Sequence, residues 1–216
     1  MHQLILVRHG QSEPNARGAL VGRSDHGLTD LGRSQAGALA RQLAAEALRW
    51  PDGGRILSSP LLRARDTAGA ILAELQRAGA ANGPAEIDDR LVELDYGGLD
   101  GLLPAEVDAA VWAAWRADPA FRPAGGETLA ELQERCNLLF DELQAGALEE
   151  HDKRVVVAVS HVSPIKAAVV WALGVDPRIS WKLQLPVAAI TRIALGRRGP
   201  ALVSFGETLR RDEGSA

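Results

Sequence analysis

The sequence has very little cysteine, no long apolar run and no excess of basic residues. Its 216 residues include a single cysteine, Cys136, which excludes an internal disulfide and a structural zinc site built from CxxC pairs. The apolar run at residues 4–7 is too short for a signal-peptide core or a membrane span, and no other uncharged run is long enough. These absences predict a cytoplasmic protein with no membrane partner.

The charge balance argues against a nucleic-acid partner. There are 24 basic and 28 acidic residues, and the net charge is -4. An anionic ligand must therefore be held by a few well-placed arginines and not by a general basic field. The length fits one compact domain, which we expect over residues 1–209, followed by a loose polar tail at residues 210–216.

Strands and helices are predicted to alternate along the chain. Short apolar runs indicate buried strands at residues 4–7, 55–57 and 155–159, a weak one at 86–87, and later ones at 188–195 and 201–205. Helices are expected from the Thr29 cap to Trp50, from a Ser59 cap to Ala78, over 104–117, after Gly126, and from Pro164 to Leu173. This alternation predicts an α/β fold, a three-layer αβα sandwich with a mostly parallel sheet and helices on both faces.

Polar residues follow three of the predicted strands directly. They are Arg8-His9, Ser58-Ser59 and Ser160-His161. In parallel sheets, ligands bind at the carboxyl ends of the strands. We therefore expect these three clusters to meet in one crevice.

The segment that begins at Arg8 contains a possible nucleophile and residues that can bind a phosphate group. Arg8 disfavours a second positive charge on His9, and a neutral imidazole has a lone pair that can attack phosphorus. Gly10 leaves room for a close approach, and the Asn15 amide can donate to a phosphate oxygen. The competing interpretation is that His9 is an ordinary loop histidine with its hydrogen bonds satisfied.

Three further residues are candidates for the same crevice. Arg63 lies in the first turn of its helix, where a cation is unfavourable unless it faces an anion, and its planar group suits phosphate. His161, as an imidazolium, could stabilise a transferring phosphoryl group, although a structural histidine is the competing interpretation. From the spacing of residues alone, we expect Glu93 to be a surface carboxylate.

Four segments, in this order, carry a resemblance to a known family. They are Arg8-His9-Gly10 with Asn15, Ser58-Ser59-Pro60 with Arg63, Leu91-x-Glu93-x-x-x-Gly97, and Ser160-His161. Over residues 3–195 the chain thereby resembles the histidine phosphatase superfamily, also called phosphoglycerate mutase-like. After His161, Val162-Ser163-Pro164 replaces the usual glycine pair, which is similar to the branch with acid phosphatases and α-ribazole phosphatase-like domains.

The resemblance implies a role for each candidate. His9 would carry the phosphoryl group, Glu93 would be the general acid and base, and His161 would assist catalysis. The phosphate pocket would consist of Arg8, Asn15, Arg63, His161 and the backbone amide of Val162. The implied activity is metal-independent hydrolysis of a small-molecule phosphomonoester, without a cofactor.

Other functions stay open at this point. A bisphosphoglycerate-dependent mutase needs cations for a second anionic group, and residues 94–124 contain only Arg116 and Arg122. A non-catalytic binding domain on the same fold is a second alternative, and metal ligation by the two histidines with Glu93 is a third. The substrate is undetermined, as is a homodimer through the sheet edge near 188–205. Three aromatics form either a lid over the leaving group or only core: Trp112, Trp115 and Phe121.

Overall fold

The computed structural model describes residues 2–50, 53–149 and 155–208. Within these ranges the strands are β1 (His2–Arg8), β2 (Gly54–Ser58), β3 (Glu86–Ile87), β4 (Val155–Ser160), β5 (Ile190–Leu195) and β6 (Ala201–Glu207). The α-helices are α1 (Glu13–Ala16), α2 (Asp30–Ala47), α3 (Leu62–Arg77), α4 (Ala109–Ala117), α5 (Leu129–Glu149) and α6 (Val162–Leu173). Short 3₁₀ helices are η1 (Asp89–Leu91), η2 (Gly97–Leu99), η3 (Pro104–Glu106) and η4 (Pro177–Lys182). The polar tail predicted at residues 210–216 lies outside the described residues.

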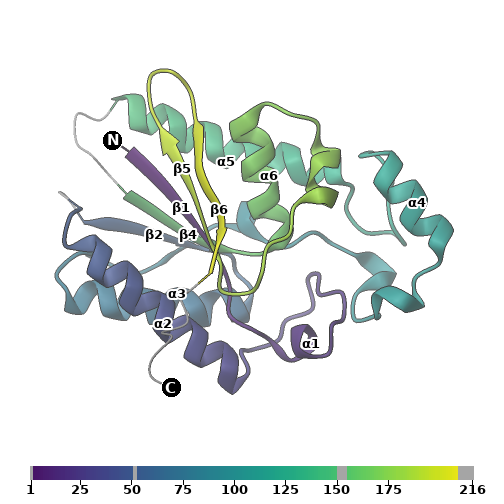
Figure 1. The fold of residues 1–216 in the computed structure, drawn as a ribbon, viewed down its shortest axis with the longest axis horizontal. Coiled ribbons are helices and arrows are strands. Elements are labelled where there is room, and N and C mark those ends of the chain that lie inside the picture. Colours follow the sequence, from purple (N-terminus) through teal and green to yellow (C-terminus); the bar gives the residue numbers. More distant parts are fainter. Residues whose placement is uncertain (1, 51–52, 150–154, 209–216) are drawn as a thin grey trace, which may run out of the picture.

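The strands form one mixed sheet in the order β3-β2-β4-β1-β5-β6. The first four in this order pair in parallel, and β5 and β6 add antiparallel pairs at one edge. Helices α2 and α3 cover one face of the sheet, and α5 and α6 cover the other (Figure 1). The predicted three-layer sandwich with a mostly parallel sheet is confirmed.

The two cores follow from the alternation of side chains along the buried strands. In β1, Leu4 and Leu6 face α5 and α6, whereas Ile5 and Val7 face α2 and α3, and all four are fully buried. An uninterrupted apolar run is what a strand covered on both faces requires. The same run fixes where β1 stops, because its next residues are polar.

Several predicted helix boundaries are wrong, for local reasons. Helix α3 begins at Leu62 and not at Pro60, and the hydroxyl of Ser59 bonds His161 instead of capping the helix. Helix α6 begins at Val162, two residues before Pro164, which fits inside the first turn because amides there need no helical partner. The predicted helix over 104–117 divides into η3 and α4, with Asp108 as the cap of α4.

The prediction for the start of α2 is confirmed, since the Thr29 hydroxyl accepts a hydrogen bond from the Gly32 amide at 3.0 Å. This helix ends at Ala47, before the predicted end at Trp50. Within the described ranges, no helix combines the length and the apolar character needed to cross a membrane.

Candidate active site

The sheet register brings three polar strand ends together. Arg8 of β1 pairs with Ser160 of β4, and Ser58 of β2 pairs with Val159 of β4. Just beyond the strands, the His9 amide donates to Ser160 O at 3.0 Å and the Ser59 amide donates to Val159 O at 2.9 Å. Because these strands are parallel neighbours, His9, Ser59 and His161 must leave the sheet at the same edge.

His9 is held as a neutral ring with one nitrogen free to accept. Its side chain is buried, and its Nδ1 lies 2.7 Å from the carbonyl oxygen of Gly10. A carbonyl can only accept, so Nδ1 carries the proton and Nε2 keeps its lone pair. Burial, followed by the charges of Arg8 and Arg63, lowers the pKa of His9 well below its ordinary value. The neutral form expected from the sequence therefore has a structural cause.

Arg63 connects the histidine to the loop that follows α1. Its Nε donates to His9 Nε2 at 3.3 Å, and its two terminal nitrogens donate to Ser24 O at 2.8 Å and Gly22 O at 2.7 Å. Asp100 fixes this loop by accepting from the backbone amides of both loop residues. The guanidinium group is fully buried and locked in place, at the position expected for a group that contacts the phosphate.

His161 lies against His9, with their ring centroids 4.9 Å apart. Its Nε2 bonds the hydroxyl of Ser59 at 2.7 Å, and its buried Nδ1 has no hydrogen-bond partner. Burial, together with the charges of His9, Arg63 and Arg8, lowers its pKa well below the ordinary value. The expected imidazolium is thus corrected for the ligand-free protein, in which the ring is neutral.

Glu93 faces the same site from the segment after η1. Only 3% of the residue is exposed, which corrects the description of a surface carboxylate. Its Oε1 accepts from the backbone amides of Leu94 at 2.7 Å and Ser163 at 3.2 Å. No hydrogen bond from the described residues reaches its other oxygen. Burial lowers the pKa of both Arg8 and Arg63, and the charge of Glu93 opposes this shift in each, which places the carboxylate within electrostatic reach of the two arginines.

The remaining predicted residues lie around this centre in different ways. The Arg8 side chain donates to Leu185 O, and burial lowers its pKa to about 10. Asn15 uses its Oδ1 to accept from the Ser12 amide at 3.2 Å and the Ser12 hydroxyl at 2.8 Å, which leaves its amide nitrogen for another acceptor. Val162 is the first residue of α6, so its N–H has no partner inside the helix.

Gly10 is required for a reason that differs from the expected phosphate approach. A Cβ atom at Gly10 would lie 2.4 Å from the carbonyl oxygen of Gly32, in the first turn of α2. The Gly10 amide also donates to the hydroxyl of Thr67 in α3 at 3.1 Å. The glycine therefore lets the loop after β1 pack between two helices, which fixes the neighbouring His9.

Sequence reasoning missed two contacts at the site. Ser59 was expected in the crevice and also as a helix cap, and it is the hydrogen-bond partner of His161. Arg135 of α5 supports the backbone at Glu93. It donates to the backbone oxygen of Glu93 at 3.3 Å and forms an ion pair with both carboxylate oxygens of Glu127. No local sequence pattern predicts either contact, because each contact joins segments far apart in the chain.

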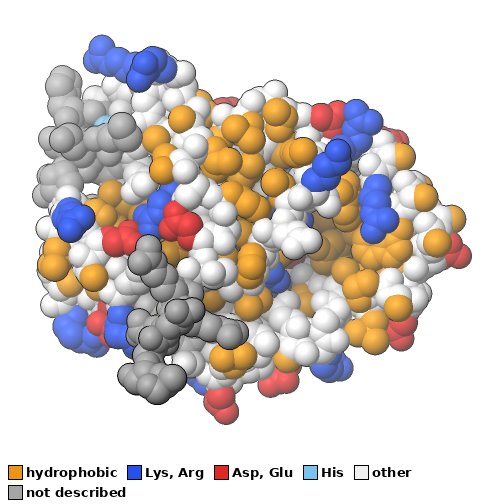
Figure 2. Space-filling model, in the orientation of Figure 1, with side chains coloured by type: hydrophobic (Ala, Val, Ile, Leu, Met, Phe, Trp, Pro, Cys, Tyr) orange, Lys and Arg blue, Asp and Glu red, His pale blue; other side chains and the backbone are white. Residues whose placement is uncertain are grey.

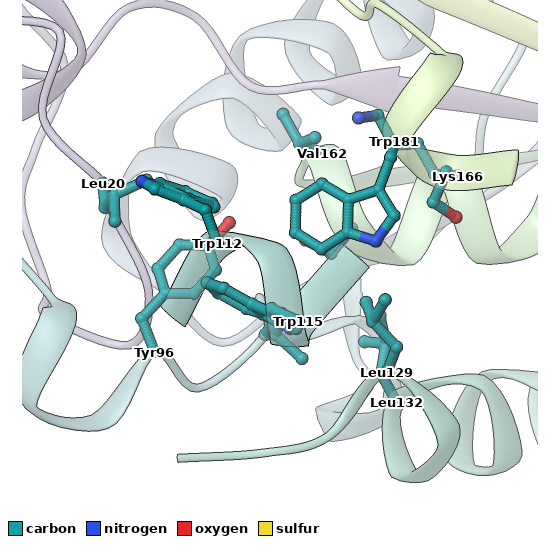
Figure 3. Close-up of a pocket in the computed structure, with 12 residues that line it drawn as sticks. Leu20, Tyr96, Trp112, Trp115, Leu129, Leu132, Val162, Lys166 and Trp181 are labelled. Carbon is teal, nitrogen blue, oxygen red and sulfur yellow. The ribbon is translucent and has the colours of Figure 1, made fainter. Parts of the chain in front are cut away.

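An apolar pocket adjoins Glu93. Its volume is about 90 Å³, and its walls come from several elements (Figure 3). The lining includes Leu94 and Ser163, the two residues whose amides bind the Glu93 carboxylate. Trp112 and Trp115 line this pocket and also pack into the core, whereas Phe121 packs only against the core among the described contacts.

The fold is an α/β sandwich that gathers two histidines, two arginines and a glutamate at one edge of its sheet, and the comparison with protein families identifies its class. The sequence model of the histidine phosphatase superfamily (branch 1) matches residues 4–208. The chain belongs to this superfamily.

Its relatives include several phosphatases. It is 37% identical, over 84% of this chain and 78% of the relative, to glucosyl-3-phosphoglycerate phosphatase of Mycolicibacterium vanbaalenii. It is 33% identical to phosphoserine phosphatase 1 of Hydrogenobacter thermophilus, over 96% of this chain and 93% of that one. A 2,3-bisphosphoglycerate-dependent phosphoglycerate mutase of Methylobacterium is 38% identical, but over only 59% of this chain and 61% of the relative.

Solved structures agree with this assignment. Phosphoserine phosphatase of Entamoeba histolytica, bound to phosphoserine, superposes with a TM-score of 0.79 at 27% identity and covers 96% of this chain and 98% of that one. The chain spans about half the length, 49%, of other curated relatives from Mycobacterium that it matches at 34% identity.

Proposed function

We propose that this protein is a phosphatase that hydrolyses small-molecule phosphomonoesters through a phosphohistidine on His9. The proposal rests mainly on one arrangement, the neutral His9 ring whose Nε2 lone pair faces the buried guanidinium group of Arg63. A phosphoryl group that takes the place of this hydrogen bond would contact a nucleophile and a cation at once. Family membership and the phosphatases among the relatives support the same conclusion.

In the first step, His9 Nε2 attacks the phosphorus atom and the bond to the ester oxygen breaks. The protonated Glu93 carboxyl gives its proton to the departing alcohol oxygen. Because Oε1 is engaged by two backbone amides, the free oxygen of Glu93 is the one that transfers the proton. Charge on the transferring group is stabilised by Arg63, and by Arg8, Asn15 and the Val162 amide.

In the second step, water attacks the phosphohistidine. Glu93 takes a proton from this water, the bond from phosphorus to Nε2 breaks, and inorganic phosphate leaves. His161 is neutral before the substrate binds, and a phosphate dianion beside it favours its protonated form. The hydrogen bond to Ser59 fixes the orientation of its ring.

Hydrolysis is favoured over the mutase reaction, which the resemblance leaves open. A mutase must retain a substrate that carries a second phosphoryl group, and both cations of residues 94–124 are engaged elsewhere. Arg116 lies over the Trp112 ring at 5.3 Å, and Arg122 binds Glu131 and Gly126 O. Phosphate release and isomerisation of 3-phosphoglycerate, measured on one preparation, test this choice. Efficient isomerisation that depends on bisphosphoglycerate would reverse it.

The decisive experiment removes the nucleophile. His9→Ala is expected to lower turnover of a generic phosphomonoester at least about a thousandfold. The acid-labile phosphorylated protein that wild type accumulates during turnover should disappear. His2→Ala, at the opposite end of the same strand, is the matched control and should keep both. Normal turnover by His9→Ala would refute the proposal.

A second pair of variants tests the phosphate pocket. Arg63→Ala removes a buried cation beside His9, whereas Arg65→Ala removes an exposed one on the same helix. Loss of a preorganised charge partner typically lowers kcat about 10²- to 10³-fold. We expect such a loss for Arg63→Ala alone, and equal activities of the two variants would place the phosphate elsewhere.

The finer parts of the proposal are each open to direct measurement. Activity should survive EDTA, since the mechanism needs no metal. Phosphoserine and glucosyl-3-phosphoglycerate, taken from the names of the relatives, are the first substrates to test. We also propose that residues 1–209 act as one phosphatase domain, that the protein works in the cytoplasm, and that its partner is a phosphate ester.

A further inference from the structure

The pocket adjoins the residues whose amides bind the Glu93 carboxylate, which makes it the candidate site for the leaving group. In the proposed mechanism Glu93 protonates the departing oxygen, so the alcohol part of the substrate lies on its side of the phosphorus atom. The pocket wall contains Leu94 and Ser163, whose amides bind the Glu93 carboxylate. On the face drawn in Figure 2, hydrophobic side chains gather around a hollow between α6 and α4.

One cation lies among the mostly apolar and aromatic residues that line the pocket. Lys166 of α6 is that residue, and within the described residues no hydrogen bond or ion pair joins its ammonium group to another group. The uncharged polar side chains of the lining with hydroxyl groups are Tyr96, Ser163 and Ser180. A partly buried cation without a partner is costly, so a ligand that supplies an anionic acceptor would be favoured.

Two features argue against a cationic leaving group such as choline. The aromatic rings pack against one another, with centroids 5.3 Å apart for Trp115 and Trp181 and 6.1 Å for Trp112 and Trp181. Rings in direct contact leave no space for an ammonium group between them. The charge of Lys166 also repels a cation. Figure 3 shows Lys166 rising from α6 beside Trp181.

The size of the pocket limits the body of the leaving group. About 90 Å³ is the space of roughly three water molecules in the liquid, and it is smaller than the cavity of about 150 Å³ that accepts benzene in another protein. A compact chain of a few carbons fits this space. The apolar walls can pack against the carbon atoms of the leaving group, and Lys166 can pair with a negative charge at its end.

We propose that this pocket binds a compact leaving alcohol that carries a carboxylate, and that Lys166 pairs with the carboxylate. Lys166 is then a specificity-determining residue for the reaction. This inference rests on the proposed function, because it takes Glu93 as the general acid. The burial of Lys166 lowers its pKa, and a bound carboxylate would restore the charged form.

The test uses two esters that differ only in charge, 3-phosphooxypropanoate and its neutral amide, 3-phosphooxypropanamide. Wild type should prefer the carboxylate about tenfold or more in kcat/KM, as expected for one charge-assisted hydrogen bond. Lys166→Met should bring the ratio close to one by losing activity on the carboxylate alone. Lys166→Arg should keep most of the preference.

Three results would overturn the inference. One is an unchanged ratio in Lys166→Met, and another is a wild-type preference for phosphocholine or the amide. A third is an equal loss on both esters, which would mean that Lys166 acts through Glu93 and not on the substrate. Unchanged turnover of the amide ester also shows that Lys166→Met is folded.

A binding measurement separates this inference from the proposed function. Calorimetry of the intact esters on His9→Ala protein, with and without Lys166→Met, needs no turnover. A carboxylate preference that depends on Lys166 in binding, with no hydrolysis by wild type, would refute the phosphatase proposal and leave the pocket assignment standing. Hydrolysis by wild type without any such preference would do the reverse.

Discussion

Acidification should weaken the fold through the two buried histidines of the site. His9 and His161 are neutral in the folded protein because burial and the nearby arginines lower the pKa of each. In the unfolded chain both return to a pKa near 6.5. Below that pH the unfolded state binds more protons than the native state, so the free energy of unfolding falls as the pH falls. Above it, the contribution is complete and no longer depends on pH.

The expected effect is large. Each buried imidazole that stays neutral costs about 1.4 kcal/mol for every pH unit below its unfolded pKa. Between pH 7 and pH 5 this amounts to at most about 2 kcal/mol for each histidine and at most about 4 kcal/mol for both. A typical domain has only about 5–15 kcal/mol of stability. The loss is therefore well within the range of a denaturant titration.

Urea unfolding at pH 7, 6 and 5, in phosphate-free buffer, measures this slope. Wild type should lose up to about 4 kcal/mol, and His9→Gln or His161→Gln should each lose only about half of the wild-type amount. If the two site variants also keep the full slope, the native rings titrate normally. The argument for a neutral nucleophile would then fail.

The remaining predictions concern packing and support of the site. Gly32→Ala should destabilise the fold by more than about 2 kcal/mol, because its Cβ would lie 2.0 Å from a backbone oxygen. Gly69→Ala has open space around it and should stabilise the fold by about 0.5–1 kcal/mol. Thermal unfolding of the two variants measures both effects. Arg135→Met should cost about 1.5–3 kcal/mol in urea because Glu127 loses its two-pronged partner and keeps only the longer ion pair to Arg23 at 3.4 Å, and adding Glu127→Gln should recover part of that loss. Asp100→Asn should raise KM and lower kcat for any monoester, because the loop that holds the Arg63 guanidinium loosens; unchanged kinetics would contradict this.

Much of the architecture is predictable because burial on both faces leaves a simple local signature. The fully apolar runs of β1 and β4 mark central strands, and the first polar residue after each marks the edge where ligands bind. Helix starts were less predictable. Serine is a common helix cap, but the hydroxyl of Ser59 bonds the imidazole of His161, and the helix begins later, at Leu62.

Glu93 illustrates the limit of local reasoning. Nothing in its neighbours distinguishes it from a surface acid, and only the resemblance to a family singled it out. The structure buries it against the amide of Ser163, 70 residues further along the chain. Burial of a charged side chain depends on what packs over it, and that partner cannot be identified from nearby sequence.

The order of most strands and helices, the strand ends that carry His9 and His161, and the family can be predicted from the sequence. The first two depend on short-range patterns of apolar and polar residues, which set the local structure. Three other features depend on tertiary packing: the hydrogen-bond partner of each His9 nitrogen, the carbonyls that hold Arg63, and the apolar pocket that Lys166 lines. Each of these is a contact between distant segments, and such contacts are set by how the layers pack.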